Sequence, residues 1–222
     1  MATVTLTTLR TRVRERADMV GSSFVADTAT GLDAWINEAV QKLHGMLVDA
    51  LGEEYVSSSS AFTTVSGQSD YTLPATFYKL YGVDLQMNGD IYALEPYMRP
   101  ERNVYRNTQT AGWYLPRYSL VGSNLRLYPV PSPNLSGTVL FAPEATTLVS
   151  GTDSVNFPNG WERFIVLDAA IQALAKEESS ITALSNEREA VVREIQQTKE
   201  SRDYANPKRV VDTNLVDSEL WW

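Results

Sequence analysis

The chain has 222 residues, of which 43% are hydrophobic and 21% are charged, a composition typical of a globular protein with one domain or two small ones. Acidic residues outnumber basic ones 27 to 19, and the formal net charge of −8 argues against a dedicated nucleic-acid-binding protein, whose affinity comes from lysine and arginine at phosphates. The lack of cysteine excludes disulfides, thiolate nucleophiles and sulfur-ligated zinc. With no signal-peptide pattern and no apolar run of about 18 residues, we expect a protein made in the cytoplasm without membrane contact.

Apolar residues three or four positions apart predict a helix over 6–20 and a stronger one over 32–51, which Gly52 ends. Thr30-x-x-Asp33 has the pattern of a capping box for the second helix. His44, the single histidine, lies beside the apolar stripe of that helix, and we expect it to have a structural role. The other faces of the first helix form either a solvated surface or the lining of a channel or partner contact; their basic residues are Arg10, Arg12, Arg14 and Arg16.

A β region follows, because apolar residues now alternate with polar ones. The turn Asn88-Gly89 predicts a hairpin, since both residues adopt positive φ at low cost. Residues 99–107 are expected to add one or two helical turns. The region should therefore form a small antiparallel sheet or barrel, with strands over 57–65, 77–87, 91–94, 117–121, 125–128 and 138–142.

Aromatic residues crowd this β region. Tyrosine is favoured in strands, in subunit contacts and in sites that stack a sugar or a base, so three interpretations stay open. The residues concerned are Trp113 and Tyr71, Tyr78, Tyr81, Tyr92, Tyr97, Tyr105, Tyr114, Tyr118 and Tyr128.

Helical periodicity returns at residues 157–162, where Asn159 is placed to cap a helix that stays apolar as far as Ala175. A second C-terminal helix is predicted over 180–204. Since each terminal pair of helices is half a bundle, we predict an α+β fold in which the pairs join. The predicted parts are a helical domain (1–54 and 157–203), an inserted antiparallel β domain (55–156) and an extended C-terminal tail (204–222).

The tail combines apolar side chains with a segment too short and too polar to build a core after Pro207, which cannot continue a helix. Leaving a large apolar side chain in water forfeits roughly 1.5 to 3 kcal/mol. We therefore expect the tail to bind another protein chain, with folding back onto its own helices as the alternative. The candidate partner-binding residues are Val210, Val211, Leu215, Val216, Leu220, Trp221 and Trp222.

No motif indicates a catalytic site, a metal site or a cofactor-binding site. The glycines form no phosphate-binding loop, and no nucleophile motif accompanies His44. Carboxylate pairs such as Glu53-Glu54 are usual on solvated surfaces. The chain is thus expected not to be an enzyme; a cell-wall glycosidase, or a carbohydrate-binding module using the tyrosines, remains the alternative.

Several segments, in their order, resemble the head-to-tail adaptor proteins of tailed bacteriophages. These are 35–39 (WINEA), 71–80 (YTLPATFYKL), 125–131 (LRLYPVP), 157–162 (FPNGWE) and 176–178 (KEE). The resemblance extends over about residues 6–204. It implies a structural virion protein at the neck, without active site or cofactor.

The resemblance also implies partners. Similar adaptors form a ring, usually of twelve copies, which docks on the portal protein, extends the DNA channel and provides the platform for a tail or nozzle protein. Genomic DNA passes through such a ring without sequence-specific binding. The helical domain would build the ring, and a C-terminal segment would reach onto the portal.

Overall fold

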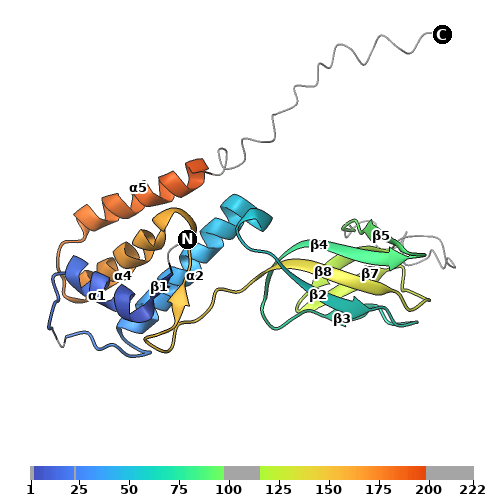
Figure 1. Ribbon diagram of the computed structural model, residues 1–222, viewed down its shortest axis with the longest axis horizontal. Helices are drawn as coiled ribbons and strands as arrows, with labels where there is room; N and C mark the ends of the chain where they lie inside the picture. The colour runs from blue at the N-terminus through green and yellow to red at the C-terminus, as the bar shows by residue number, and fades with distance from the viewer. Residues whose placement is uncertain (1–2, 23, 98–115, 199–222) are drawn as a thin grey trace, which may run out of the picture.

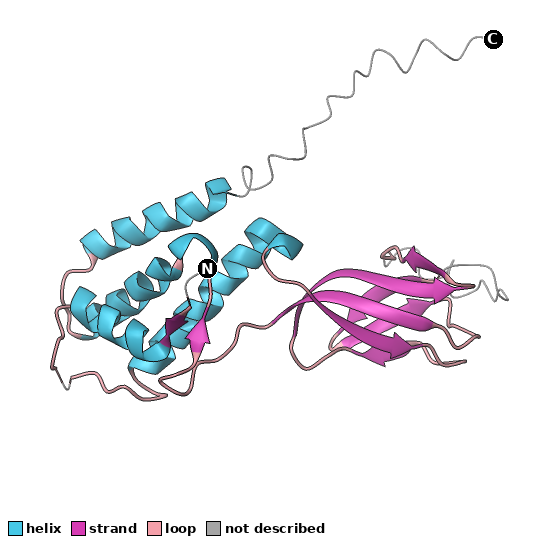
Figure 2. Cartoon of the chain, viewed as in Figure 1, coloured by secondary structure: helices cyan, strands magenta, loops and turns pink. Residues whose placement is uncertain are grey.

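The computed structural model describes residues 3–22, 24–97 and 116–198, and all structural statements concern these residues. It combines helices with antiparallel sheets, which confirms the α+β class (Figure 2). The helices are α1 (Leu6–Arg16), α2 (Leu32–Leu51), α4 (Glu162–Lys176) and α5 (Thr182–Thr198), with the short 3₁₀ turns η1 (Gly52–Glu54) and η3 (Pro158–Gly160).

The strands make three sheets, with the orders β1-β9, β2-β8-β4-β5 and β3-β7-β6. Every pair of neighbouring strands is antiparallel. Their bounds are β1 (Val4–Thr5), β2 (Ser58–Thr63), β3 (Asp70–Thr72), β4 (Phe77–Met87), β5 (Asp90–Ala93), β6 (Arg117–Val121), β7 (Asn124–Tyr128), β8 (Ser136–Pro143) and β9 (Ser154–Val155).

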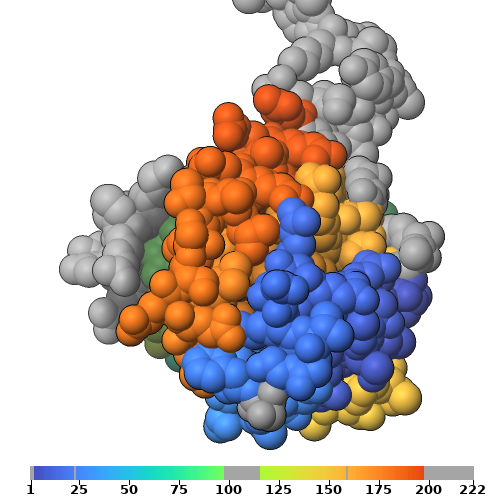
Figure 3. Space-filling view, turned by 90° about the vertical axis from the view of Figure 1, so that its left-hand side faces the viewer, coloured from blue at the N-terminus to red at the C-terminus, as the bar shows by residue number. Residues whose placement is uncertain are grey.

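Helix α4 lies at the centre of the helical part and contacts α1, α2 and α5 (Figure 1). Small side chains let these helices approach closely, and Ala169, Ala170 and Ala173 are fully buried. In Figure 3 the N-terminal residues, in blue, and α5, in orange, lie side by side on the helical end. The two ends of the sequence thus share one apolar core, as expected for joined helix pairs.

The larger two sheets enclose a second apolar core. Its buried residues come from both sheets and include Leu85, Val139 and Phe141 of one sheet and Leu125 and Leu127 of the other. The β4–β5 hairpin turns at Asn88 and Gly89, whose φ angles of 54° and 95° are those of the predicted Asn-Gly turn. This hairpin is confirmed, and the sheets face each other as a small sandwich.

The segment between the β lobe and α4 belongs to the helical core. Strand β9 pairs with β1, so that Val155 lies opposite Val4. Leu148 and Val155 are buried in the helical core although both lie within the range 55–156 of the predicted inserted domain. The packing therefore changes from one core to the other near Pro143, at the end of β8.

The first helix is shorter than the predicted 6–20. It ends at Arg16, because Asp18 adopts a φ of 56° and turns the chain out of the helix. Met19 then folds back into the core, whereas Val20, predicted for the apolar face, is exposed. The prediction for helix α2, in contrast, is confirmed from Leu32 to Leu51.

Both predicted helix caps are wrong. Helix α2 has Gly31 at its N-cap with no side-chain cap, so Thr30 and Asp33 form no capping box. A Cβ on Gly31 would lie 2.3 Å from the carbonyl oxygen of Ala26, which explains glycine at this position. Helix α4 has Trp161 at its N-cap position, without a side-chain cap, and not the predicted Asn159. The helical turns predicted over 99–107 lie outside the described residues.

The packing of α4 at the centre of the helical part can be tested by enlarging one of its small side chains. Replacing the buried Ala170 by leucine adds three carbon atoms to a filled core and should lower the free energy of unfolding by about 1 to 3 kcal/mol. Ala190→Leu, at an exposed position of α5, should change it by less than about 0.5 kcal/mol. Urea denaturation measures both, and equal losses would contradict a packed α4.

Candidate functional site

The single histidine lies at the junction of the helical and β parts. His44 comes from α2, is buried, and its Nε2 lies 2.9 Å from the carbonyl oxygen of Pro143 at the end of β8. Its Nδ1 lies 3.2 Å from the hydroxyl of Tyr55, and the ring makes edge contacts with Tyr55 and Tyr78. His44 therefore joins the two lobes, in agreement with the expected structural role.

The hydrogen bonds define the tautomer of the neutral His44 ring. A carbonyl oxygen only accepts, so Nε2 carries the proton and Nδ1 of the neutral ring accepts from the Tyr55 hydroxyl. Burial raises the pKa of Tyr55 to about 12, which keeps this donor protonated. Burial also lowers the pKa of His44 below its ordinary value of 6.5. The ring is thus a structural hydrogen-bonding group and not a charged site.

The described residues contain no group of three or more histidine, cysteine, aspartate or glutamate side chains that could hold a metal ion. Nor does any residue of this part pair a nucleophile with His44, since both ring nitrogens are engaged by Tyr55 and Pro143.

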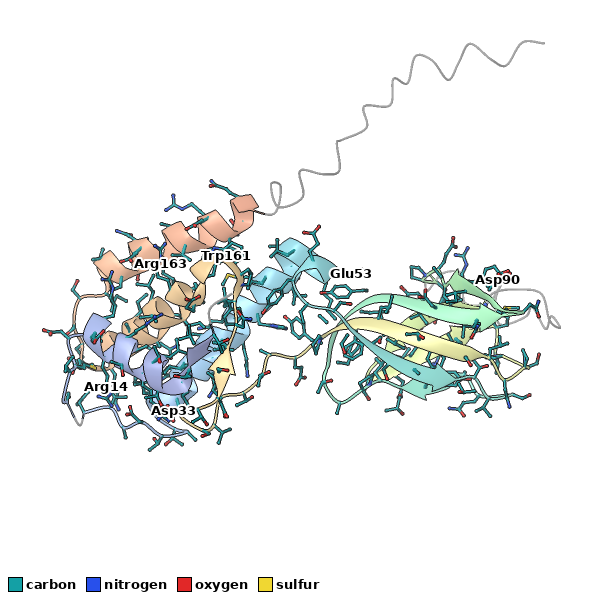
Figure 4. The ribbon with its side chains drawn as sticks, in the orientation of Figure 1. Arg14, Asp33, Glu53, Asp90, Trp161 and Arg163 are labelled. Carbon is teal, nitrogen blue, oxygen red and sulfur yellow. The ribbon has the colours of Figure 1, made fainter. Side chains whose placement is uncertain are left out.

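The arginines of α1 have different environments. Arg10 donates from Nε and Nη2 to the two carboxylate oxygens of Asp33, at 2.7 and 2.8 Å. Arg14 donates to the carbonyl oxygens of Ser22 and Val25 and thereby fixes the loop after α1. Figure 4 shows Arg14 and Asp33 toward the same end of the helical part.

The remaining two arginines lie nearer to the surface. Arg16 pairs with Glu187 of α5. Arg12 is exposed and has no hydrogen bond or ion pair within the described part of the chain, so it is the best placed of the four to line a channel. Both border a depression that is also lined by Arg163 and by Glu15, Glu162 and Glu187, so the three carboxylates there offset the formal charge of the three arginines. Channel lining stays a prediction.

The tyrosines of the β region do not form one site. Tyr71 is buried, and its hydroxyl donates to the carbonyl oxygen of Gln68 at 2.9 Å. Tyr81 donates to the carbonyl oxygen of Val56, whereas Tyr78 and Tyr92 are exposed. Tyr105, Tyr114 and Trp113 lie outside the described residues. Strand packing thus explains part of this set, and subunit contact stays open for the exposed members.

The sequence analysis missed one charged cluster. Asp168 of α4 has a side chain that is only 3% exposed, and it accepts from Lys42 of α2 at 3.1 Å and Arg188 of α5 at 2.8 Å. A lone aspartate within an apolar helix could have indicated a paired buried charge. Its partners, far away in the sequence, could not be identified from spacing.

All seven candidate partner-binding residues of the tail, Val210 to Trp222, lie outside the described residues. The family comparison reaches part of this region, since a family model described as SU10 adaptor protein matches residues 4–211. The chain belongs to the SU10 adaptor protein family. It is therefore a bacteriophage head-to-tail adaptor, which confirms the resemblance noted in its segments. The search of curated proteins found no match.

Membership in the SU10 adaptor family places the protein among structural components of the virion neck, which contact portal and tail components. None of the helices in the described ranges has the length and apolar character of a membrane span. The family match ends at 211, so Leu215, Val216, Leu220 and the two terminal tryptophans lie beyond it. Their role must be established for this SU10 adaptor itself.

The Arg10–Asp33 pair can be separated from the other arginines by mutation. Arg10→Met leaves Asp33, whose side chain is 8% exposed, without its cation, and should lower the free energy of unfolding by about 3 kcal/mol. Arg12→Met removes an exposed charge and should change it by less than about 0.5 kcal/mol. Chemical denaturation of both variants gives the comparison. A similar loss in both would show that Arg10 has no special structural role.

The junction histidine predicts a pH dependence. Because the folded-state pKa of His44 is lowered, the unfolded chain binds more protons below pH 6.5, and stability should fall as the pH drops through that value. The slope cannot exceed about 1.4 kcal/mol per pH unit. Urea denaturation from pH 7.5 to 5 measures it, and His44→Gln should flatten the profile, since the chain has no other histidine. Asp70 and Asp153 also have a lowered pKa, but the stability that they contribute is lost only as the pH falls below about 4. An unchanged slope in the variant would disprove the assignment.

Proposed function

We propose that this adaptor assembles into a ring, of twelve copies, that docks on the portal, extends the DNA channel and provides the platform on which the tail or nozzle protein attaches. The observation that carries the proposal is the SU10 adaptor family match over residues 4–211. The formal charge of −8 per subunit agrees with a channel along which DNA moves without being held.

The two lobes suggest which part of the subunit forms the ring and which part contacts the tail. The helical part has its own apolar core, formed by both ends of the described chain, and we assign ring formation to it. The β lobe projects from it along the long axis of the molecule (Figure 1), and we assign to it the contact with the next tail component. Val65, Ile91 and Val130 are exposed apolar residues of the β lobe and are candidate contact residues for this proposal.

The tail 204–222 is proposed as the element that binds the portal. Its aromatic and aliphatic side chains are of the kind that dominate interface energies when they fill a pocket of the partner. Burying these side chains against the portal would offset the chain entropy that a bound segment loses.

Deletion of residues 208–222 tests this assignment. The shortened subunit should keep its thermal unfolding transition, because both apolar cores lie within residues 4–195, but should no longer remain on the portal. Light scattering of the protein alone and mixed with portal gives the mass, and with it the number of copies in the ring.

Point variants refine the same test. Trp221→Ala combined with Trp222→Ala should weaken portal binding at least tenfold, which corresponds to about 1.4 kcal/mol. Val149→Ala, which shortens a side chain that is 78% exposed elsewhere on the surface, serves as the control and should bind normally. Portal binding that persists after the deletion would refute the docking role of the tail. A complex whose mass corresponds to a single adaptor subunit on the portal would refute the ring.

A further inference from the structure

An open groove runs between α2 and α5, with α4 as its floor. Its volume is about 640 Å³, within the range of roughly 300–1,000 Å³ that is usual for sites enclosing a small ligand or a few side chains. Figure 1 shows α5 running toward the end of α2 that adjoins the β lobe, and these two helices contact each other. The lining residues are Lys42, Met46, Phe164, Asp168, Arg188, Glu189, Val192 and Arg193.

The groove has an apolar centre and a polar rim. Met46 and Val192 are only partly buried against the helical core, and Phe164 lies beneath them in α4. The lining carries three cations, Lys42, Arg188 and Arg193, against two carboxylates, Asp168 and Glu189, so its formal charge is +1, and Asp168 is already paired with Lys42 and Arg188. Arg193 is exposed, and its Nε donates within the described residues to its own helix, at the carbonyl oxygen of Glu189. Such a surface suits an apolar peptide that carries negative charge.

The last thirteen residues of this chain have that chemistry. Residues 210–222 contain no lysine or arginine and three acidic side chains, besides their aliphatic residues and two tryptophans. The apolar members would cover the groove centre, and the acidic ones would lie near the cations of the rim. No other stretch of the chain outside the described residues combines two adjacent tryptophans with an excess of acids.

The tail also has the length to reach the groove of its own subunit. Helix α5, whose residues form one wall, is described to Thr198, only five residues or about 7.5 Å of helix beyond Arg193. Residues 199–209 can span up to about 36 Å when extended, which is ample for the chain to reverse. Because both parts belong to one chain, their effective concentration is far above that of a separate peptide.

We propose that the groove between α2 and α5 binds residues 210–222 of the same chain while no portal is present. In the free subunit, Trp221 and Trp222 would then be kept out of water. The portal would compete with the groove for the same residues and displace them from it. The groove contact is independent of the proposed ring and portal docking, and it can be tested on the isolated full-length protein.

The lack of cysteine makes the test direct. In the full chain, Met46→Cys with Leu220→Cys places one thiol in the groove and one in the tail, and oxidised glutathione can link them while being reduced itself. The matched control is Ala190→Cys with Leu220→Cys, whose first thiol is exposed on α5 outside the groove lining. The groove pair should form the intrachain disulfide at least about tenfold faster than the control. Mass spectrometry and electrophoresis without reductant follow the reaction.

Two further variants identify the groove as the cause. Adding Val192→Glu to the groove pair, or Arg193→Glu, which changes only an exposed side chain, should slow the disulfide toward the control rate. Thermal unfolding checks that each variant folds. Equal rates for the groove and control pairs would overturn the proposal, and so would disulfides that join two chains. None of these results involves the portal, so they are distinguishable from a failure of the proposed docking.

Discussion

The fold depends on one constraint, the burial of helix α4. A helix with apolar residues on all sides must be surrounded, because each exposed leucine or phenylalanine forfeits roughly 1.5 to 3 kcal/mol. Helices α1 and α2 cover two sides and α5 another, so both ends of the sequence must meet around α4. Most of the chain between α2 and α4, from β2 to β8, thereby lies outside the helical part and forms its own core in the β lobe, whereas Leu148 and Val155 return to the helical core.

Charged contacts then determine which helices pack against α4 and α1. Asp168 is a buried charge in an otherwise apolar helix, and it is tolerable only where Lys42 and Arg188 come together. Arg10 performs the complementary task by holding Asp33 at the start of α2. A pairing of helices that separated these groups would leave a carboxylate uncompensated. These contacts therefore favour one arrangement of the bundle over alternatives with the same apolar burial.

The sequence predicted what depends on local periodicity and missed what depends on distant contacts. Helix α2 and the Asn88-Gly89 hairpin were predictable, since an apolar stripe and a two-residue turn are short-range signals. The capping box failed because Asp33 is engaged by Arg10, 23 residues earlier. Likewise, the β1–β9 pair was too short for a pattern, and the groove wall combines residues from α2, α4 and α5. The chemistry of the tail was readable from its composition, but its binding surface was not.

The path of the chain through the β lobe has an evolutionary consequence. The chain enters the lobe along β2 and leaves it along β8, and these are adjacent strands with Ser58 opposite Phe141. The two ends of the insertion are thus separated by one strand spacing, about 5 Å. A lobe attached in this way can be enlarged, reduced or exchanged as a cassette, because any substitute that brings its ends equally close leaves the helices where they are. A change within the lobe can thereby leave the helical part unaltered.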